Sequence, residues 1–146
     1  MQVVRVTDNT GRVITPEWLL RAEAVHRQLR PLLPQDYASR LSEVFANGAR
    51  LALVVDADQV VSVALWRVIE NTADGRRLYV DDLVSDDNRR SSGAGKLMLD
   101  WLEGEAKRLV CDVLTLDSGV HRQRAHHFYF REGMHIPSFC FRKALK

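Results

Sequence analysis

The chain has 146 residues, 46% of them hydrophobic and 27% charged, and a formal net charge of +2 at pH 7. This length suits one domain with its own core, so we expect a single domain over residues 1–146. So small a charge argues against binding to nucleic acid or to an anionic membrane. No stretch approaches the roughly 20 apolar residues of a membrane span, and no signal peptide is visible, so we expect a cytoplasmic protein.

The first part of the chain predicts a strand followed by two helices. Residues 2–7 (QVVRVT) are typical of a short strand. Residues 15–29 predict a helix with Thr15 as its N-cap and Pro16 in its first turn, and apolar residues follow at helical spacing. Residues 35–48 predict a second helix, which ends at an Asn-Gly pair.

Three strands are expected after this pair. Residues 49–58 and 59–70 are rich in Val and Leu, and the DADQ segment where they meet is typical of a hairpin turn. The turn signal NTADGRR follows, and residues 78–85 (LYVDDLVS) predict the next strand.

The rest of the chain alternates helices and strands. Residues 95–109 predict a helix, residues 111–119 a strand, residues 122–133 an amphipathic helix and residues 138–145 a last strand. The inner side of the first of these helices is expected to carry Leu97 or Met98, Trp101, Leu102, Ala106 and Leu109. A strand, loop, helix and strand in succession imply a parallel pair within an otherwise antiparallel sheet. We therefore expect a mixed α/β (α+β) fold.

The two cysteines, Cys111 and Cys140, lie in apolar, strand-like runs without the spacing of a disulfide framework. We expect buried free thiols, and a disulfide is the alternative. Free thiols agree with a reducing compartment such as the cytoplasm.

Residues 89–96 (RRSSGAGK) combine glycines, hydroxyls and basic residues between a predicted strand and a predicted helix. A Walker A loop would need glycine at 90 and a hydroxyl at 97, where the chain has Arg90 and Leu97, and the dinucleotide fingerprint would need glycine at 98, which is Met98. The pattern Arg-x-x-Gly-x-Gly does fit residues 90–95. Its glycines would let backbone N–H groups approach a diphosphate at the helix N-terminus, and a solvated turn is the alternative.

The segments VDDLVSDDNRRSSGAGKLML and AHHFYFREGM together resemble the GNAT superfamily of acetyl-CoA-dependent N-acetyltransferases. The resemblance is close from about residue 78 to the C-terminus, and the first half agrees only in the order of its elements. It implies a GNAT-type fold, with a mostly antiparallel central sheet flanked by helices and one parallel strand pair at the acetyl-CoA site.

The resemblance also implies which residues hold acetyl-CoA. The pyrophosphate would lie on the glycine loop, where Arg89, Arg90 and Lys96 supply positive charge, and the pantetheine arm would lie beside the preceding strand. Arg122 stands where the commonest form of the family has asparagine, and it could still reach a CoA phosphate or a substrate carboxylate. The expected contacts are Leu83, Val84, Ser85, Arg89, Arg90, Ser91, Ser92, Gly93, Ala94, Gly95, Lys96 and Arg122.

Acetyl transfer to an amine needs a base for the ammonium and an acid for the thiolate leaving group. The resemblance assigns the acid to Tyr129, whose phenol, with a pKa of about 10, stays protonated at pH 7; a core aromatic is the alternative. It favours Asp81 over Asp82 as a base acting through water, and neighbours in a strand are expected to point to opposite faces. The alternative for Asp81 is a carboxylate that pairs with Arg or attracts a cationic substrate. A backbone N–H of the segment 83–84 is the expected oxyanion donor.

The remaining polar motifs predict no metal site. His126 and His127 are adjacent on a helix and so point about 100° apart, and no Cys or carboxylate set completes a tetrahedral arrangement. Asp86 and Asp87 are expected to cap the turn or to balance the arginines that follow them, since they lack the spacing of a calcium loop.

We therefore expect an N-acetyltransferase that transfers the acetyl group of acetyl-CoA to a primary amine by direct attack in a ternary complex. The acceptor is a small molecule or a protein amine, and a negatively charged cleft near Asp81 would favour small cations. The segment LDSGVHR resembles one bacterial subgroup, and Asp117, Ser118 and His121 are expected near the cleft mouth. The alternative is a non-catalytic acyl-CoA-binding module. The apolar residues 138–145 predict a homodimer.

Overall fold

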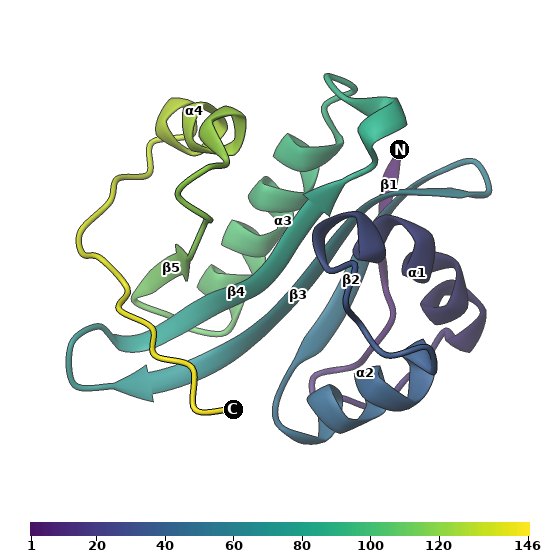
Figure 1. Ribbon diagram of the computed structural model, residues 1–146, viewed down its shortest axis with the longest axis horizontal. Helices are drawn as coiled ribbons and strands as arrows, with labels where there is room; N and C mark the ends of the chain where they lie inside the picture. The colour runs from purple at the N-terminus through teal and green to yellow at the C-terminus, as the bar shows by residue number, and fades with distance from the viewer. The chain divides into compact units, whose positions relative to one another are not determined.

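The computed structural model describes residues 1–146, in which the chain forms two compact units, Met1–Thr115 and Leu116–Lys146 (Figure 1). The first half carries β1 (Gln2–Arg5), α1 (Pro16–Leu29), α2 (Tyr37–Ala46), β2 (Arg50–Asp56) and β3 (Gln59–Asn71). The second half carries β4 (Gly75–Ser85), the short helix η1 (Asp87–Arg89), α3 (Ala94–Arg108), β5 (Val113–Leu116) and α4 (Gln123–Arg131). The single N-acetyltransferase domain stays a prediction.

The strands form one five-stranded sheet in the order β1-β2-β3-β4-β5. The first four strands are antiparallel neighbours. Turns at the predicted positions join β2 to β3 and β3 to β4, whereas α1 and α2 lie between β1 and β2 along the chain. The crossover through α3 makes β4 and β5 the one parallel pair, which confirms the expected fold class.

Within the first unit, α1 and α2 cover one face of the sheet and α3 covers the other (Figure 1). The sheet strands alternate accordingly, because successive side chains of a strand point to opposite faces. The core under α1 and α2 includes Leu19, Leu41, Phe45, Leu53 and Val63, all buried.

The residues predicted to start α1 and to end α2 lie at those helix ends in the structure. Thr15 precedes α1 and Pro16 occupies its first turn, although the Thr15 hydroxyl donates to the Arg5 carbonyl and not to the helix. Gly48 follows α2 with a φ of 103°, a left-handed conformation that glycine adopts without strain.

The predicted strand at residues 138–145 is wrong. Residues 134–146 form no helix or strand, and Phe139 and Phe141 are 82% and 95% exposed. Alternating apolar residues become a strand only where a sheet edge receives them, and no edge pairs with this segment. The homodimer expected from this segment therefore stays a prediction.

The cysteines are also not where they were expected. Cys111 is half-buried and Cys140 is exposed, and neither lies in a strand. Both are free, as expected. Partial burial raises the pKa of the Cys111 thiol, and Arg76 opposes part of this shift.

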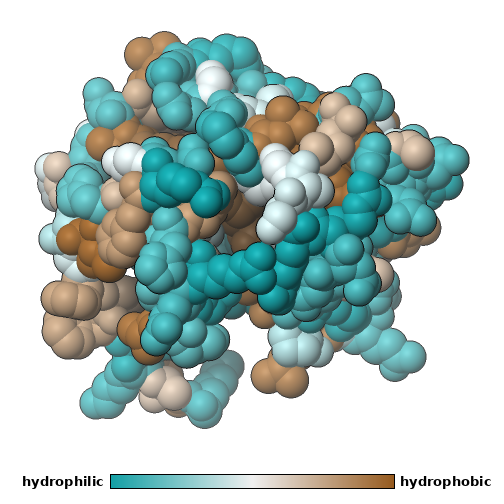
Figure 2. Space-filling view, turned by 90° about the horizontal axis from the view of Figure 1, so that it is seen from above, coloured by the Kyte–Doolittle hydropathy of each residue, from teal (hydrophilic) through white to brown (hydrophobic).

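Polar side chains cover much of the surface in Figure 2, and apolar ones lie between them. None of the helices combines the length and the apolar character that crossing a membrane would require.

The inner face of α3 contains one charged residue that its apolar spacing did not predict. Met98, Leu102 and Ala106 are buried as expected, and Glu105 is buried with them. The Glu105 carboxylate accepts hydrogen bonds from Arg5 and from Arg108, the latter at 3.0 and 2.8 Å. Burial alone would raise the pKa of Glu105, but these two guanidiniums lower it to about 2.

Glu105→Gln is expected to lower the free energy of unfolding at pH 7 by about 2 kcal/mol, because charge-assisted hydrogen bonds are lost. Urea unfolding measures this. The matched control is Glu103→Gln, whose exposed pair with Lys107 on the same helix should contribute about 0.5 kcal/mol. Because its pKa is depressed, Glu105 stabilises fully above pH 4.5 and loses this effect as the pH falls towards 2, so the difference must shrink in acid. A pH-independent difference would contradict this assignment.

Candidate active site

The glycine loop between β4 and α3 is shaped by two left-handed residues. Gly93 is the N-cap of α3 with a φ of 87°, and Ser91 has a φ of 62°. No side chain caps the start of α3, and the first N–H groups of a helix have no partner within it. The Ser92 hydroxyl oxygen is buried without a hydrogen-bond partner. The start of α3 thus has no side-chain cap, and one buried hydroxyl of the loop has no hydrogen-bond partner.

Each basic side chain of this loop already has a carboxylate partner. Arg89 contacts Asp56, Arg90 contacts Asp87, and the Lys96 ammonium lies 3.0 Å from Asp100 one turn along α3. Asp86 caps η1 by accepting from the Asn88 N–H at 3.1 Å. The predicted roles of Asp86 and Asp87, a turn cap and a partner for arginine, are thus both present.

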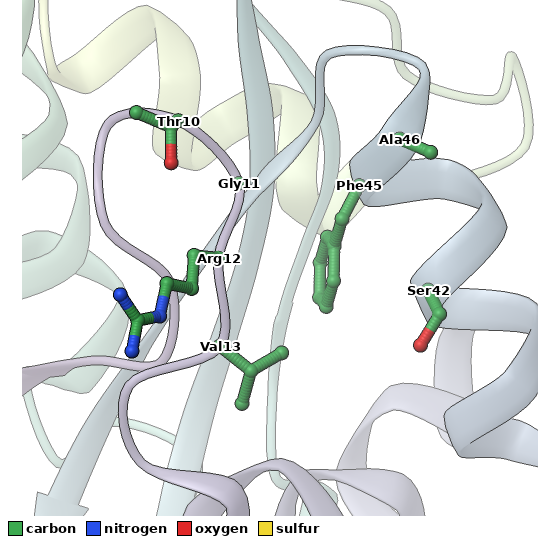
Figure 3. A pocket seen from close by; sticks show the side chains of 7 residues that line it. All are labelled: Thr10, Gly11, Arg12, Val13, Ser42, Phe45 and Ala46. Atoms are coloured by element: carbon green, nitrogen blue, oxygen red, sulfur yellow. The ribbon is translucent and has the colours of Figure 1, made fainter.

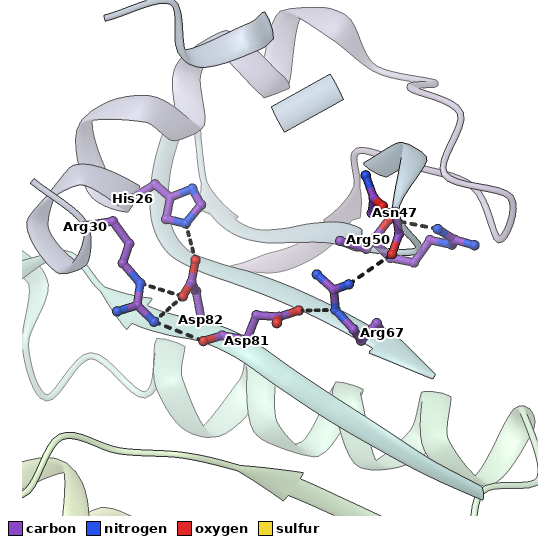
Figure 4. Close-up of polar contacts among 8 residues, drawn as sticks. His26, Arg30, Asn47, Arg50, Arg67, Asp81 and Asp82 are labelled. Atoms are coloured by element: carbon purple, nitrogen blue, oxygen red, sulfur yellow. Dashed lines mark hydrogen bonds and ion pairs between the residues drawn. The ribbon is translucent and has the colours of Figure 1, made fainter. Parts of the chain in front are cut away.

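A β-bulge interrupts β4 at Asp81. Leu65 of β3 pairs with Asp82 and Trp66 pairs with Val80, so Asp81 has no partner across the ladder. Such an extra residue breaks the alternation of side chains. The expectation that Asp81 and Asp82 point to opposite faces is therefore wrong: both carboxylates lie on the face covered by α1 and α2 (Figure 4).

Asp82 is the buried carboxylate of the two, with 8% of its surface exposed. It lies 2.7 Å from the His26 Nε2 and accepts from the Arg30 Nε at 2.7 Å. The other His26 nitrogen, Nδ1, lies 2.8 Å from the Tyr37 hydroxyl. Burial alone would raise the pKa of Asp82, but the hydrogen bonds from His26 and Arg30 hold it below its usual value. Asp82 is thus an anion that fastens α1 to β4.

Tyr37 is the third member of this hydrogen-bonded row. Burial raises the pKa of its phenol far above the usual value, so the hydroxyl keeps its proton beside the His26 Nδ1. The His26 Nε2–H then donates to Asp82.

Asp81 is the more accessible carboxylate, and its side chain is 24% exposed. It accepts from the Arg67 Nε at 2.8 Å, and the Arg67 Nη1 donates to the Asn47 carbonyl at 3.0 Å (Figure 4). Burial raises the pKa of Asp81, and the hydrogen bond and charge of Arg67 offset part of the shift. A raised pKa is the direction that favours a general base.

The surroundings of Asp81 are not negatively charged. Arg67 pairs with its carboxylate, and the Arg30 Nη2 donates to its backbone carbonyl at 3.2 Å. Arg50 lies beside Arg67 on the same face (Figure 4). The condition under which a cleft here would favour small cations is therefore not met.

The strand that follows the bulge is closely packed. Leu83 and Val84 are buried, and the Val84 carbonyl accepts from the Ser62 hydroxyl at 2.9 Å. Ser85 at the end of β4 is half-buried. The helix η1 lies between the end of this strand and the glycine loop.

The second unit contains Tyr129 and Arg122. Tyr129 is 9% exposed, and its ring packs against Phe128 at 5.4 Å between centroids. Burial raises the pKa of the Tyr129 phenol, and the charge and hydrogen bond of Arg122 lower it by less. Arg122, placed by resemblance at the cofactor, thus also contacts the predicted acid. No group of three or more His, Cys, Asp and Glu side chains is arranged to hold a metal ion.

Asp117, Ser118 and His121 were expected at the cleft mouth. Ser118 has a buried hydroxyl without a hydrogen-bond partner. Asp117 and His121 precede α4 in the same unit. Their role stays a prediction.

A pocket of about 330 Å³ lies elsewhere, between the β1–α1 loop and α2 (Figure 3). It is lined by Thr10, Gly11, Arg12, Val13, Ser42, Phe45 and Ala46. None of the residues predicted for cofactor binding or catalysis lines it, so it gives no support to the site described above.

Sequence reasoning missed His26, Arg30, Tyr37 and Arg67. One signal for His26 was available, because it falls on the apolar stripe of α1 and is only 1% exposed. A polar side chain in such a stripe needs a buried partner. Its partner is 56 residues away, and no local pattern singles out Asp82.

The model of the Acetyltransferase (GNAT) family matches residues 17–134. An uncharacterized N-acetyltransferase of Bacillus subtilis, YhdJ, is 34% identical over 100 residues, which cover 58% of this chain and 70% of that protein. The aminoalkylphosphonate N-acetyltransferase of Salmonella typhimurium is 35% identical over 66 residues, covering 45% of this chain and 43% of that protein. The aminoglycoside N-acetyltransferase AAC(6')-Iy, solved in complex with CoA, matches the fold with a TM-score of 0.81 at 11% identity, over 99% of this chain and 95% of that one. The chain therefore belongs to the acetyltransferase (GNAT) family.

Proposed function

We propose that this protein transfers the acetyl group of acetyl-CoA to the primary amine of an acceptor by direct attack in a ternary complex. The observation that carries the proposal is the loop from Ser91 to Lys96, which presents backbone N–H groups at the uncapped start of α3. The family match and relatives named N-acetyltransferases support the reaction class.

The residues of the loop fit a diphosphate. A helix N-terminus attracts anions through its free N–H groups and its dipole. The buried Ser92 hydroxyl lacks a partner that a phosphate oxygen would supply. A Cβ at Gly93 would meet nothing nearer than the Met1 Cε at 4.0 Å, so the backbone is open to a ligand there. Leu83, Val84 and Ser85 would hold the pantetheine arm.

Two side chains would move the protons of the reaction. Bound acetyl-CoA supplies the acetyl group as a thioester. The Asp81 carboxylate would accept a proton from the acceptor ammonium through water, and its raised pKa favours this role. The Tyr129 hydroxyl would donate its proton to the departing sulfur, and its raised pKa keeps that proton in place at neutral pH. A backbone N–H of the segment 83–84 would stabilise the oxyanion.

The experiment that tests this proposal combines acetyl-CoA binding with thiol release over a panel of amines. Gly93→Ala is expected to weaken acetyl-CoA binding about tenfold or more, which calorimetry measures, since a methyl group would stand where the diphosphate approaches. The matched control is Gly48→Ala, because Gly48 also has a positive φ, 103°, with nothing within 4 Å of an added Cβ. Both should cost about 1–2 kcal/mol of stability, and only the first should lose affinity.

Two results would contradict the proposal. Equal acetyl-CoA affinity in both glycine variants would remove the loop as the diphosphate site. Tight acetyl-CoA binding by the wild type without thiol release for any amine would leave the non-catalytic binding module as the function.

A further inference from the structure

We propose that the acceptor is a small amine that also carries an anionic group, a carboxylate or a phosphonate. In this assignment Asp81 receives the ammonium group and Arg67 binds the anion. The inference rests on the proposed function, in which the acceptor amine reaches Asp81. It follows from the charges that surround the bulge in β4.

Arg67 is positioned to exchange one partner and keep another. Its Nη1 donates to the Asn47 carbonyl at 3.0 Å, which anchors the guanidinium to the end of α2. Its Nε donates to the Asp81 carboxylate at 2.8 Å. The Nη2 makes no hydrogen bond within the chain, and the side chain is 24% exposed. The Arg67 Nη2 is therefore free to donate to an incoming anion. If the Asp81 carboxylate binds the ammonium group of the acceptor instead, the Arg67 Nε can donate to the anion as well.

Each carboxylate at the bulge already has a guanidinium partner. Arg30 contacts Asp82 and Arg67 contacts Asp81, whereas the Arg50 guanidinium points away from both (Figure 4). Arg50 is held by the carbonyls of Asn9 and Ala49, at 2.8 Å each, and forms no ion pair.

The charge of Arg67 also acts on Arg50. Burial lowers the pKa of Arg50, Asp8 raises it, and the charge of Arg67, the smallest of the three effects, lowers it. An anion bound at Arg67 would reduce this repulsion.

An acceptor that carries both an ammonium and an anionic group fits the Arg67–Asp81 ion pair better than an acceptor that carries only positive charge. The pair of Arg67 and Asp81 is neutral, and a zwitterion replaces each partner by a group of the same sign, so no charge is left unpaired. A diamine would take Asp81 and leave Arg67 without a counterion beside Arg30 and Arg50. The planar guanidinium also suits the oxygens of carboxylate and phosphonate, which accept two parallel hydrogen bonds.

The test uses amines that differ only in the second group. Thiol release is measured at saturating acetyl-CoA with β-alanine and 2-aminoethylphosphonate, with the neutral amines propylamine and ethanolamine, and with 1,3-diaminopropane. At least one anionic amine is expected to show a kcat/KM about tenfold or more above the neutral amines and the diamine. Comparison of the two acids separates carboxylate from phosphonate.

Arg67→Gln should remove this preference, and Arg67→Lys should restore part of it. The matched control is Arg77→Gln, because Arg77 is 27% exposed and pairs with Asp74 at 3.5 Å at the β3–β4 turn. Melting temperatures of all variants show whether they fold. Equal kcat/KM for charged and neutral amines, a preference for the diamine, or a loss in Arg67→Gln that is the same for all amines would overturn the inference and leave the proposed function standing.

A second measurement keeps the two proposals apart. If no amine releases thiol, the proposed function fails, and binding of β-alanine and 2-aminoethylphosphonate is followed by calorimetry in the presence of CoA. Binding that requires Arg67 and that ethanolamine does not show would support the acceptor class without turnover. Absence of such binding would overturn it.

Discussion

Tyr129→Phe is expected to lower kcat for acetyl transfer by about 10²-fold or more, while the affinity for acetyl-CoA stays unchanged. The substitution removes one hydroxyl from a buried ring that also packs against Phe128, so the fold should persist. Single-turnover thiol release separates the chemical step from product release. Because burial raises the Tyr129 pKa, the alkaline limb of the wild-type pH–rate profile that reports this phenol should lie above about pH 10.

The control for this loss is Tyr79→Phe, which removes the hydroxyl of a half-buried tyrosine on β4 whose ring contacts Arg77 at 5.1 Å. Its kcat should stay close to that of the wild type. If Tyr129→Phe also keeps the wild-type kcat, Tyr129 is a core aromatic residue and not the acid.

Asp82→Ala is expected to lower the free energy of unfolding at pH 7 by about 3 kcal/mol, the largest stability effect we expect in this chain. The substitution leaves the buried His26 Nε2–H without an acceptor and Arg30 without its carboxylate. Chemical denaturation measures the loss. Because its pKa lies below 3.8, Asp82 stabilises the fold above that pH, and the difference from the wild type should fall as the pH drops below it.

The neighbouring residue gives the matched control. Asp81→Ala removes the same group one position earlier on β4, but its pair with Arg67 is 24% exposed on both sides, so the expected loss is about 1 kcal/mol or less. Equal losses in the two variants would contradict the division into a buried and an accessible carboxylate.

The sequence predicted the parts of the fold that depend on local signals. Thr15 and Pro16 marked the start of α1, and Gly48 the end of α2. These signals act within one or two turns of the chain. The strand expected at residues 138–145 failed because a strand depends on a partner, which its own residues do not specify.

In the candidate site, too, only the local features could be predicted. The sequence predicted a turn at the glycine loop, because turn geometry and helix capping depend on neighbouring residues. The carboxylates were found, but not their orientation, because a bulge is a property of two strands in register. The contacts of Asp82 with His26 and Arg30 join residues more than 50 positions apart, so no sequence pattern predicted them.

The extra residue in β4 places two acids side by side on one face, where strict alternation would allow one. One acid holds α1 against β4 and the other is accessible, so a change at residue 81 disturbs the packing of the helix less than a change at residue 82 does.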